Sequence, residues 1–318
     1  MTFVKCIRIA LDWTPNSLHV GMLLARYSGA YRKAGLDVIL ESPEDDQYLN
    51  TPMKKLVTGQ VHIAIAPTDS VISYRTLHKE YPVVAIAAIQ QHHNSAIATM
   101  AESGIDRPAD LDGKVYGSYG ARFEDAIVRH MVRHDGGNGM LRIVRPPKLS
   151  LWEALQEDEI DATWIFLPWE GALAQASGKK LNLFKPEDYG VPYATSPLMI
   201  TTERLLERYP KEFRSFMQIT RAHYEWAAKN PREAAQFLAK AQIHPSLNRA
   251  ESVAPTLEML APALVDEKGV WGTLSLEQSQ AFCNWLENHD LICDPETEMP
   301  VQVSQRCSHW FSNAWLGL

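Results

Sequence analysis

The sequence predicts an α/β protein with two lobes, each of them a mostly parallel sheet flanked by helices. Three observations support this fold class. Apolar, strand-like runs alternate with helix-like segments through the first ninety residues. The same alternation starts again near Val115, after a polar connector. The chain has 318 residues, which is too long for one simple core and suits two lobes.

The first lobe begins with a β-α-β unit. Residues 4–11 form an apolar run typical of a buried strand, and residues 22–27 have helix composition. Gly35 then ends a helix before a second apolar strand at 36–40. We expect a right-handed crossover and parallel strands. A helix at 52–58, a strand at 61–65, a helix at 71–77 and a strand at 82–89 continue the same alternation.

The second lobe shows the same alternation of strand-like and helix-like segments. We expect a strand at 115–118, a long helix to about residue 134, a helix at 151–157 and a strand at 160–166. A strand at 198–200 returns the chain to the first lobe. Helical periodicity follows through residue 239. The last quarter, including a helix at 276–287, is expected to pack outside the first lobe.

Charge and apolar patterning exclude several partners. The formal net charge is -7 and no block rich in Lys and Arg occurs, so we expect neither nucleic acid nor a membrane surface as a partner. No apolar run reaches the roughly 18 residues of a membrane span, so membrane insertion is not expected. The N-terminus lacks the pattern of a signal peptide, which predicts a cytoplasmic protein. A chain trimmed of its signal peptide would instead be periplasmic or extracytoplasmic.

Metal and disulfide chemistry are not expected. The four cysteines, Cys6, Cys283, Cys293 and Cys307, have no CxxC spacing, and their even number does not establish disulfides. The neighbouring His92 and His93 would point to opposite faces of an extended segment, so they are a poor pair for one metal ion. We therefore expect no metal site.

The first candidate ligand-binding turn follows the first strand and carries Trp13, Asn16 and His19. Open α/β sheets bind ligands outside the carboxyl ends of their strands, where this turn should lie. A structural alternative is a core role for Trp13, a helix N-cap role for Asn16 and a surface position for His19.

Similar candidates follow other strands. Asp69 and Ser70 open a helix, where capping and ligand contact are about equally expected. Trp169 and Glu170 stand at the end of the 160–166 strand, and Glu170 would be costly to bury unless a donor meets it. Further lining candidates are Tyr48, Ser118 and Tyr193 together with His19.

Five segments resemble the substrate-binding proteins of the sulfonate and thiamine-pyrimidine group, which share a fold with the fungal thiamine-pyrimidine synthases. They are residues 12–16 with His19, 35–38, 59–64, 160–162 and 169–171. The resemblance implies a two-lobed periplasmic-binding-protein (type II) fold whose lobes close around a ligand. Two hinge crossings are expected near residues 91–96 and 195–198. The first lobe would then comprise 1–92 and 197–318, and the second 93–196.

The same resemblance implies a small-molecule binding protein for a planar aminopyrimidine precursor of thiamine, of the hydroxymethylpyrimidine or formylaminopyrimidine type. Trp13 and Trp169 would offer aromatic faces on facing walls, while Asn16, Asp69 and Glu170 would hydrogen-bond to the ring edge. Uptake, sensing and biosynthesis are all compatible with such binding. An ABC permease is the expected partner if the protein is exported. No catalytic residue and no cofactor are expected.

The alternative is an enzyme similar to the hydroxymethylpyrimidine phosphate synthases. That resemblance would imply pyridoxal phosphate on a lysine, a histidine that supplies pyrimidine atoms, and a cysteine-rich motif. Residues 65–70 contain neither Lys nor His, and residues 193–196 contain no Cys. Without an amine no Schiff base can form. His62, just upstream, is a poor substitute because strand alternation alone does not bring it to the cleft.

Overall fold

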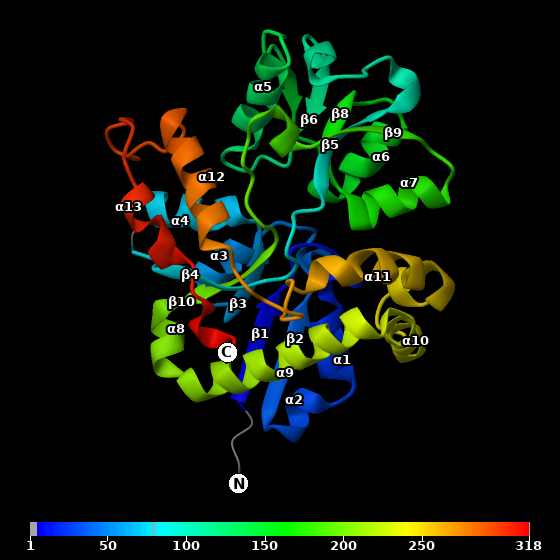
Figure 1. Ribbon diagram of the computed structural model, residues 1–318, viewed down its shortest axis with the longest axis vertical. Coiled ribbons are helices and arrows are strands. Elements are labelled where there is room, and N and C mark those ends of the chain that lie inside the picture. Colours follow the sequence, from blue (N-terminus) through cyan, green and yellow to red (C-terminus); the bar gives the residue numbers. More distant parts are fainter. Residues whose placement is uncertain (1–4, 79, 318) are drawn as a thin grey trace. The chain divides into compact units, whose positions relative to one another are not determined.

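The computed structural model describes residues 5–78 and 80–317 and divides into two compact units (Figure 1). Unit 1 takes in residues 1–93, 195–280 and 303–318. Unit 2 takes in residues 94–194 and 281–302. The chain therefore passes between the units four times, twice near the predicted crossings and twice more near the C-terminus.

The C-terminal segment 281–302 corrects the predicted lobe boundaries, which assigned all of 197–318 to the first lobe. The helix α12 (Leu276–Asn288) begins in unit 1 and ends in unit 2. Its Phe282 ring lies 5.0 Å from the ring of Tyr193, and its Trp285 ring lies 5.0 Å from that of His130. These aromatic contacts, which side-chain periodicity alone does not reveal, group the segment with unit 2.

The unit 1 sheet has the strand order β2-β1-β3-β10-β4. Strand β1 pairs in parallel with both β2 and β3, which confirms the predicted β-α-β unit. Strand β10 is antiparallel to both β3 and β4. The strands are β1 (Lys5–Ala10), β2 (Leu36–Glu41), β3 (Ile63–Ala66), β4 (Val83–Ala88) and β10 (Leu198–Thr202). The predicted start of the first strand at residue 4 lies outside the described residues.

Helices cover this sheet, and the predicted helical segments of the first lobe are confirmed. They are α1 (Val20–Tyr27), α2 (Ala30–Lys33), α3 (Pro52–Val57), α4 (Thr68–Leu77), α8 (Glu203–Arg208), α9 (Pro210–Lys229), α10 (Pro231–Ala241), α11 (Ala250–Leu264) and α13 (Ser304–Cys307). Helix α9 packs along α1, and α10 packs against α11 (Figure 1).

The unit 2 sheet has the strand order β7-β6-β8-β5-β9. Strands β6, β7 and β8 are parallel, whereas β5 is antiparallel to both of its neighbours. The strands are β5 (Ser95–Met100), β6 (Val115–Gly117), β7 (Arg142–Val144), β8 (Ala162–Phe166) and β9 (Leu181–Phe184). The helices are α5 (Glu124–His134), α6 (Leu151–Gln156) and α7 (Ala172–Ala176). Of the strands, β5, β7 and β9 were not predicted.

Two further features are the state of the cysteines and the character of the helices. None of the four cysteines, all of which lie within the described residues, forms a disulfide; Cys283 and Cys307 are buried, Cys293 is half-buried and Cys6 is exposed. Across residues 5–78 and 80–317, no helix combines the length and the apolar character that crossing a bilayer requires.

The contact between α1 and α9 depends on a glycine. A Cβ added to Gly21 would lie 2.1 Å from a ring carbon of Tyr224. The Tyr224 ring is fully buried, stacks on Trp271 with centroids 4.4 Å apart, and donates its hydroxyl proton to the carbonyl of Leu18 at 2.8 Å. Because these contacts fix the ring, it cannot move away from a larger residue.

We predict that Gly21→Ala lowers the free energy of unfolding by about 1–3 kcal/mol, the usual cost of overpacking a core. Urea denaturation of both proteins measures this difference. Gly171→Ala is the matched control, because its new Cβ would meet Leu167 at 3.5 Å, an ordinary contact. Equal stability of Gly21→Ala and the unsubstituted protein would contradict the described packing.

Candidate functional site

Polar loops gather at one edge of the unit 1 sheet. Strands β1 and β3 are parallel, so their carboxyl ends lie at the same edge. The first residue of β10, Leu198, pairs with the last residues of both β3 and β4, Ala66 and Ala88. The segments 11–16, 67–70, 89–91 and 195–197 therefore meet at this edge. This is the position at which open α/β sheets bind ligands.

Asn16 is the N-cap of a short 3-10 helix, Ser17–His19, and is only 5% exposed. Its Oδ1 accepts the N–H of Leu18 at 2.8 Å, and its Nδ2 donates to the carbonyl of Thr14 at 2.9 Å. Asn16 therefore has the helix N-cap role that was the structural alternative to ligand binding. A contact between Asn16 and a ligand stays a prediction.

His19 is completely buried and is bonded at both ring nitrogens. Its Nδ1 accepts the backbone N–H of Asn16 at 3.2 Å, and its Nε2 lies 2.8 Å from Oδ1 of Asp12. An Nδ1 atom that accepts a hydrogen bond carries no proton, so the ring proton is on Nε2 and is donated to the Asp12 carboxylate. His19 therefore ties the end of β1 to the following turn.

Trp13 is half-buried, and its ring lies 6.0 Å from that of Tyr48 at an interplanar angle of 53°. The Tyr48 hydroxyl donates to the backbone carbonyl of Asp12 at 2.6 Å. Gln47 and Tyr48 both have left-handed backbone conformations, with φ of 52° and 60°. Non-glycine residues adopt this conformation at a cost, which the surrounding contacts must offset. Trp13 and Tyr48 thus form an aromatic pair next to Asp12.

The loop after β3 leads into α4 with Pro67 as the N-cap residue and without a side-chain cap. Asp69 is 5% exposed and Ser70 is half-buried, both in the first helical turn. The neighbouring Thr68 is fully buried and donates its hydroxyl proton to the carbonyl of Thr195, at the entry to β10. Asp69 and Ser70 therefore lie at the same sheet edge as Trp13, without serving as the helix N-cap.

In unit 2, Ser118 directly follows β6 and is 1% exposed. Its hydroxyl donates to Oδ1 of Asp125 at 2.6 Å and accepts the N–H of Gly120 at 3.0 Å. These bonds shape the loop between β6 and α5. The hydroxyl of Ser118 has a structural role here, and its contact with a ligand stays a prediction.

Trp169 and Glu170 lie in a π-helical turn, Leu167–Gly171, that follows β8. Such turns are rare and occur frequently at functional sites. Trp169 is half-buried, whereas Glu170 is only 1% exposed. Oε2 of Glu170 accepts the N–H of Phe166 at 2.8 Å, but Oε1 has no hydrogen-bond partner among the described residues. Burial raises the pKa of Glu170 to about 7, and the charge of Glu153 adds to the effect.

Tyr193 belongs to an aromatic cluster of unit 2. Its ring lies 5.2 Å from that of Trp164 on β8 and 5.0 Å from that of Phe282 on α12. Trp164 is 6% exposed. Trp164 and Phe282 were not predicted as site residues, since each lies within an element where an aromatic residue is usually part of the core.

The predicted site residues thus form two groups, one in each unit. In unit 1, Trp13, Asn16, His19 and Tyr48 surround Asp12, a residue quoted in the sequence analysis only for the family resemblance. Its signal was its position, directly after the predicted strand at 4–11 and seven residues before the histidine that binds it. In unit 2, Trp169 and Glu170 share the π-helical turn after β8. That Trp13 and Trp169 stand on facing walls stays a prediction.

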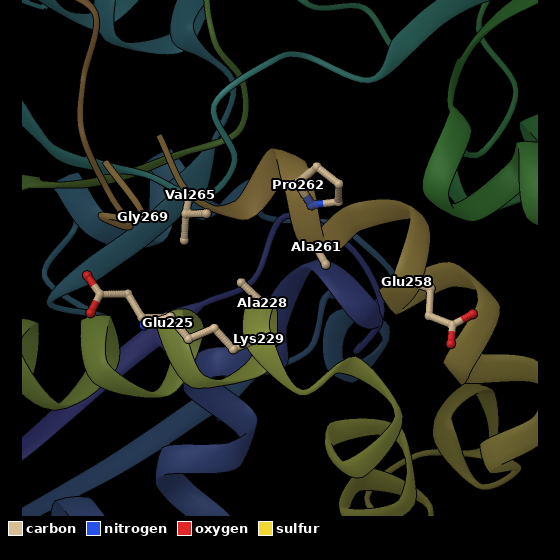
Figure 2. A pocket seen from close by; sticks show the side chains of 8 residues that line it. All are labelled: Glu225, Ala228, Lys229, Glu258, Ala261, Pro262, Val265 and Gly269. Atoms are coloured by element: carbon tan, nitrogen blue, oxygen red, sulfur yellow. The ribbon is translucent and has the colours of Figure 1, made fainter. Parts of the chain in front are cut away.

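A separate pocket of about 300 Å³ lies on the helical side of unit 1 (Figure 2). Its lining comes from α9, α11 and the segment after α11: Glu225, Ala228, Lys229, Glu258, Ala261, Pro262, Val265 and Gly269. The carboxyl groups of Glu225 and Glu258 lie at opposite ends of this lining (Figure 2). None of the predicted ligand-binding residues lines it.

Two observations concern the candidate metal ligands and His62. No group of three His, Cys, Asp or Glu residues suited to a metal ion occurs within residues 5–78 and 80–317. His62, the weak substitute for the synthase histidine, accepts the backbone N–H of Arg8 through Nδ1 at 3.0 Å, and burial lowers its pKa. The imidazole thus supports the pairing of β1 with β3.

Comparison with known proteins gives consistent results. The chain is similar, at 26% identity over 92% of its length and 88% of the relative's, to the formylaminopyrimidine-binding protein of Halalkalibacterium halodurans. It is 20% identical to a 4-amino-5-hydroxymethyl-2-methylpyrimidine phosphate synthase of Saccharomyces cerevisiae, over 72% of this chain and 68% of the relative. Among solved structures, the ligand-binding component of an ABC-type import system from Staphylococcus aureus matches with a TM-score of 0.65 and 14% identity, covering 98% of this chain and 100% of that one.

These comparisons confirm the predicted class of protein: the chain has the two-lobed periplasmic-binding-protein fold. The family follows from the sequence itself. Residues 16–234, more than half of the chain, match the model of the family described as NMT1/THI5 like, and the chain belongs to this family.

The buried Glu170 should make stability depend on pH. Its pKa is higher in the folded protein, about 7, than the ordinary value of 4.5, so folding favours the protonated carboxyl. The resulting stabilisation is fully present below pH 4.5 and is lost as the pH rises through 7. Glu170→Gln removes this dependence, and its stability relative to the unsubstituted protein should rise by about 3 kcal/mol between pH 5 and pH 8.5.

Urea denaturation at the two pH values measures this change. Glu159→Gln is the control, because Glu159 is an exposed glutamate of the same unit. A difference between Glu170→Gln and the unsubstituted protein that is the same at both pH values would show that Glu170 is ionised normally.

Proposed function

We propose that this protein binds a planar aminopyrimidine of the kind that precedes thiamine, in the uptake, sensing or biosynthesis of such a precursor. The observation that carries the proposal is the similarity to a formylaminopyrimidine-binding protein along nearly the whole of both chains. The family match and the ligand-binding fold support it. The side chains at the sheet edges of the two units suit the chemistry of this ligand.

In unit 1, the half-buried indole of Trp13 supplies an aromatic face for stacking. Its contact with Tyr48 limits how far the indole can turn, so the face is held in place before a ligand arrives. Asp69, buried in the first turn of α4, adds a carboxyl group at the same sheet edge. Stacking supplies affinity, and such polar groups supply specificity.

In unit 2, Glu170 supplies a buried carboxyl with one oxygen available. An aminopyrimidine presents an exocyclic N–H next to a ring nitrogen, which is a donor beside an acceptor. A carboxyl protonated at Oε1 offers a donor to the ring nitrogen, and Oε2, which already accepts the N–H of Phe166, has a second lone pair for the exocyclic N–H. Since the pKa of Glu170 is about 7, the protonated form is present near neutral pH. Trp169 in the same turn offers a second aromatic face.

We propose that binding requires no pyridoxal phosphate and that no residue is catalytic. The loop after β3 offers neither Lys nor His, as the synthase alternative would need. The similarity to a yeast synthase keeps that alternative as the second candidate. Absorbance at the Schiff-base band after addition of pyridoxal phosphate separates the two, because only an enzyme-bound aldimine gives it.

The partner depends on where the protein acts. The likeness to the binding component of an ABC-type import system supports a permease partner for a protein that serves uptake. Sensing or biosynthesis would need no permease. A gene for a membrane permease beside the gene of this protein would favour uptake.

Titration calorimetry with 4-amino-5-hydroxymethyl-2-methylpyrimidine and with a formylaminopyrimidine tests the proposal. We predict that the protein binds at least one of them, and that Trp13→Ala and Trp169→Ala each weaken binding roughly 5- to 150-fold, as expected for loss of one stacked base at about 1–3 kcal/mol.

Trp226→Ala is the control for these variants. Trp226 lies on α9, is 43% exposed and is not a predicted site residue, so its loss should leave the affinity unchanged. Absence of binding by the unsubstituted protein would contradict the proposed function. Unchanged affinity in both Trp13→Ala and Trp169→Ala would remove the two tryptophans from the site.

A further inference from the structure

The polar residues of the first turn divide into two sets by their hydrogen bonds. Asn16 uses both side-chain polar atoms within the turn, and His19 uses both ring nitrogens. His19 has no ring nitrogen left for a ligand without breaking a bond of the turn, and Asn16 keeps only the second N–H of Nδ2 and the second lone pair of Oδ1. Asp12 differs, since its side chain is 16% exposed and receives one hydrogen bond, at Oδ1. No other hydrogen bond to this carboxylate is formed by the described residues.

The bond from His19 gives the Asp12 carboxylate a fixed orientation. A completely buried imidazole that accepts at Nδ1 has a single proton to donate, and it donates this proton to Asp12 at 2.8 Å. Oδ1 is therefore engaged by a group that cannot rotate away. The second oxygen, Oδ2, keeps the acceptor capacity of an ionised carboxylate.

The main chain of Asp12 is held as well. The Tyr48 hydroxyl donates to its carbonyl at 2.6 Å, and Leu11 donates its N–H to the carbonyl of Glu41 at 3.0 Å. Tyr48 takes a left-handed backbone conformation to reach this place. A residue anchored at its backbone and at one carboxylate oxygen is prearranged to accept a donor at the other oxygen.

We propose that Asp12 contacts the ligand directly, accepting a hydrogen bond from an exocyclic amino group through Oδ2, and that His19 is the positioning residue that orients this carboxylate. The inference rests on the proposed function and names the part of the ligand that unit 1 recognises. The amino group lies in the plane of the ring, and Asp12 directly precedes the indole that would stack on that ring. An ionised carboxylate is the strongest acceptor that a side chain offers to an amino group.

The experiment compares two probes on the full-length protein by titration calorimetry. One probe is 4-amino-5-hydroxymethyl-2-methylpyrimidine, and the other is the same compound without its 4-amino group. Asp12→Asn keeps the size of the side chain and an oxygen that can accept from His19. At the position of Oδ2, the substitution replaces the carboxylate oxygen with an amide N–H₂ donor, or with a neutral amide oxygen if the side chain is turned over. We expect roughly a 10- to 100-fold loss of affinity for the amino probe and little change for the probe that lacks the amino group.

Variants of His19 test the positioning role. Gln places an amide N–H₂ near the position of the imidazole Nε2, whereas the shorter Asn cannot reach Asp12. His19→Gln should therefore retain the affinity for the amino probe within a few-fold, and His19→Asn should lower it roughly tenfold. In an Asp12→Asn background, His19→Asn should have no further effect, because the carboxylate that it orients is gone.

The outcomes separate the inference from the proposed function. If the unsubstituted protein binds neither probe, the proposed function fails and the inference fails with it. If it binds both but Asp12→Asn weakens them equally, the inference alone fails, because a general disturbance of the turn does not distinguish the probes. Equal losses in His19→Gln and His19→Asn would overturn the positioning role.

A second measurement applies if Asp12→Asn does not fold. In a crystal structure of the unsubstituted protein with the amino probe, the amino nitrogen should lie within hydrogen-bonding distance, about 3.2 Å, of Asp12 Oδ2. An amino group that makes no contact with Asp12 Oδ2 would overturn the inference.

Discussion

The turn after β1 depends on one buried imidazole. His19 joins a carboxylate at the end of the strand to the backbone of the following 3-10 helix, and it does so without exposure to solvent. A polar ring at this depth is stable only if both nitrogens are satisfied, and here both are. Asn16 adds the cap, and Tyr48 holds the carbonyl of Asp12. These bonds fix the orientations of the Asp12, Asn16 and His19 side chains.

Unit 2 presents the opposite situation at Glu170. There a carboxyl is buried with one oxygen satisfied and the other without a partner among the described residues. Burial without full hydrogen bonding shifts the pKa upward and costs stability when the group ionises. A ligand that supplies the missing partner would recover part of that cost. The polar groups of the first turn in unit 1 are thus satisfied within the protein, whereas Glu170 in unit 2 keeps one oxygen without a partner among the described residues.

The sequence predicted the architecture well where apolar periodicity was strong. The parallel pairing of β1 with β2 and the helices of unit 1 are confirmed, because buried parallel strands are continuous apolar runs flanked by recognisable helix ends. Three strands of unit 2 were missed for particular reasons. Strand β5 consists largely of small residues, β7 has three residues, and β9 carries a polar Asn182. The grouping of α12 with unit 2 depends on aromatic contacts far apart in the chain, which a local pattern cannot reveal.

Of the candidate site, the sequence predicted the turn that carries Trp13, Asn16 and His19 but not the hydrogen bonds within it. Asn16 and His19 hydrogen-bond within this turn, whereas Asp12, whose side chain is 16% exposed, receives a hydrogen bond at only one carboxylate oxygen from the described residues. Residue types in a loop do not show which polar atom is already used, since that depends on backbone groups brought in by the fold.

The central claim, that His19 is an internal donor which fixes the Asp12 carboxylate, is tested most directly by nitrogen NMR of the His19 ring in the ligand-free protein. Long-range proton–nitrogen correlations distinguish a protonated ring nitrogen from an unprotonated one. The result expected at neutral pH is a single tautomer, protonated at Nε2 and unprotonated at Nδ1. A ring protonated at Nδ1, or one that exchanges between tautomers, would contradict the claim.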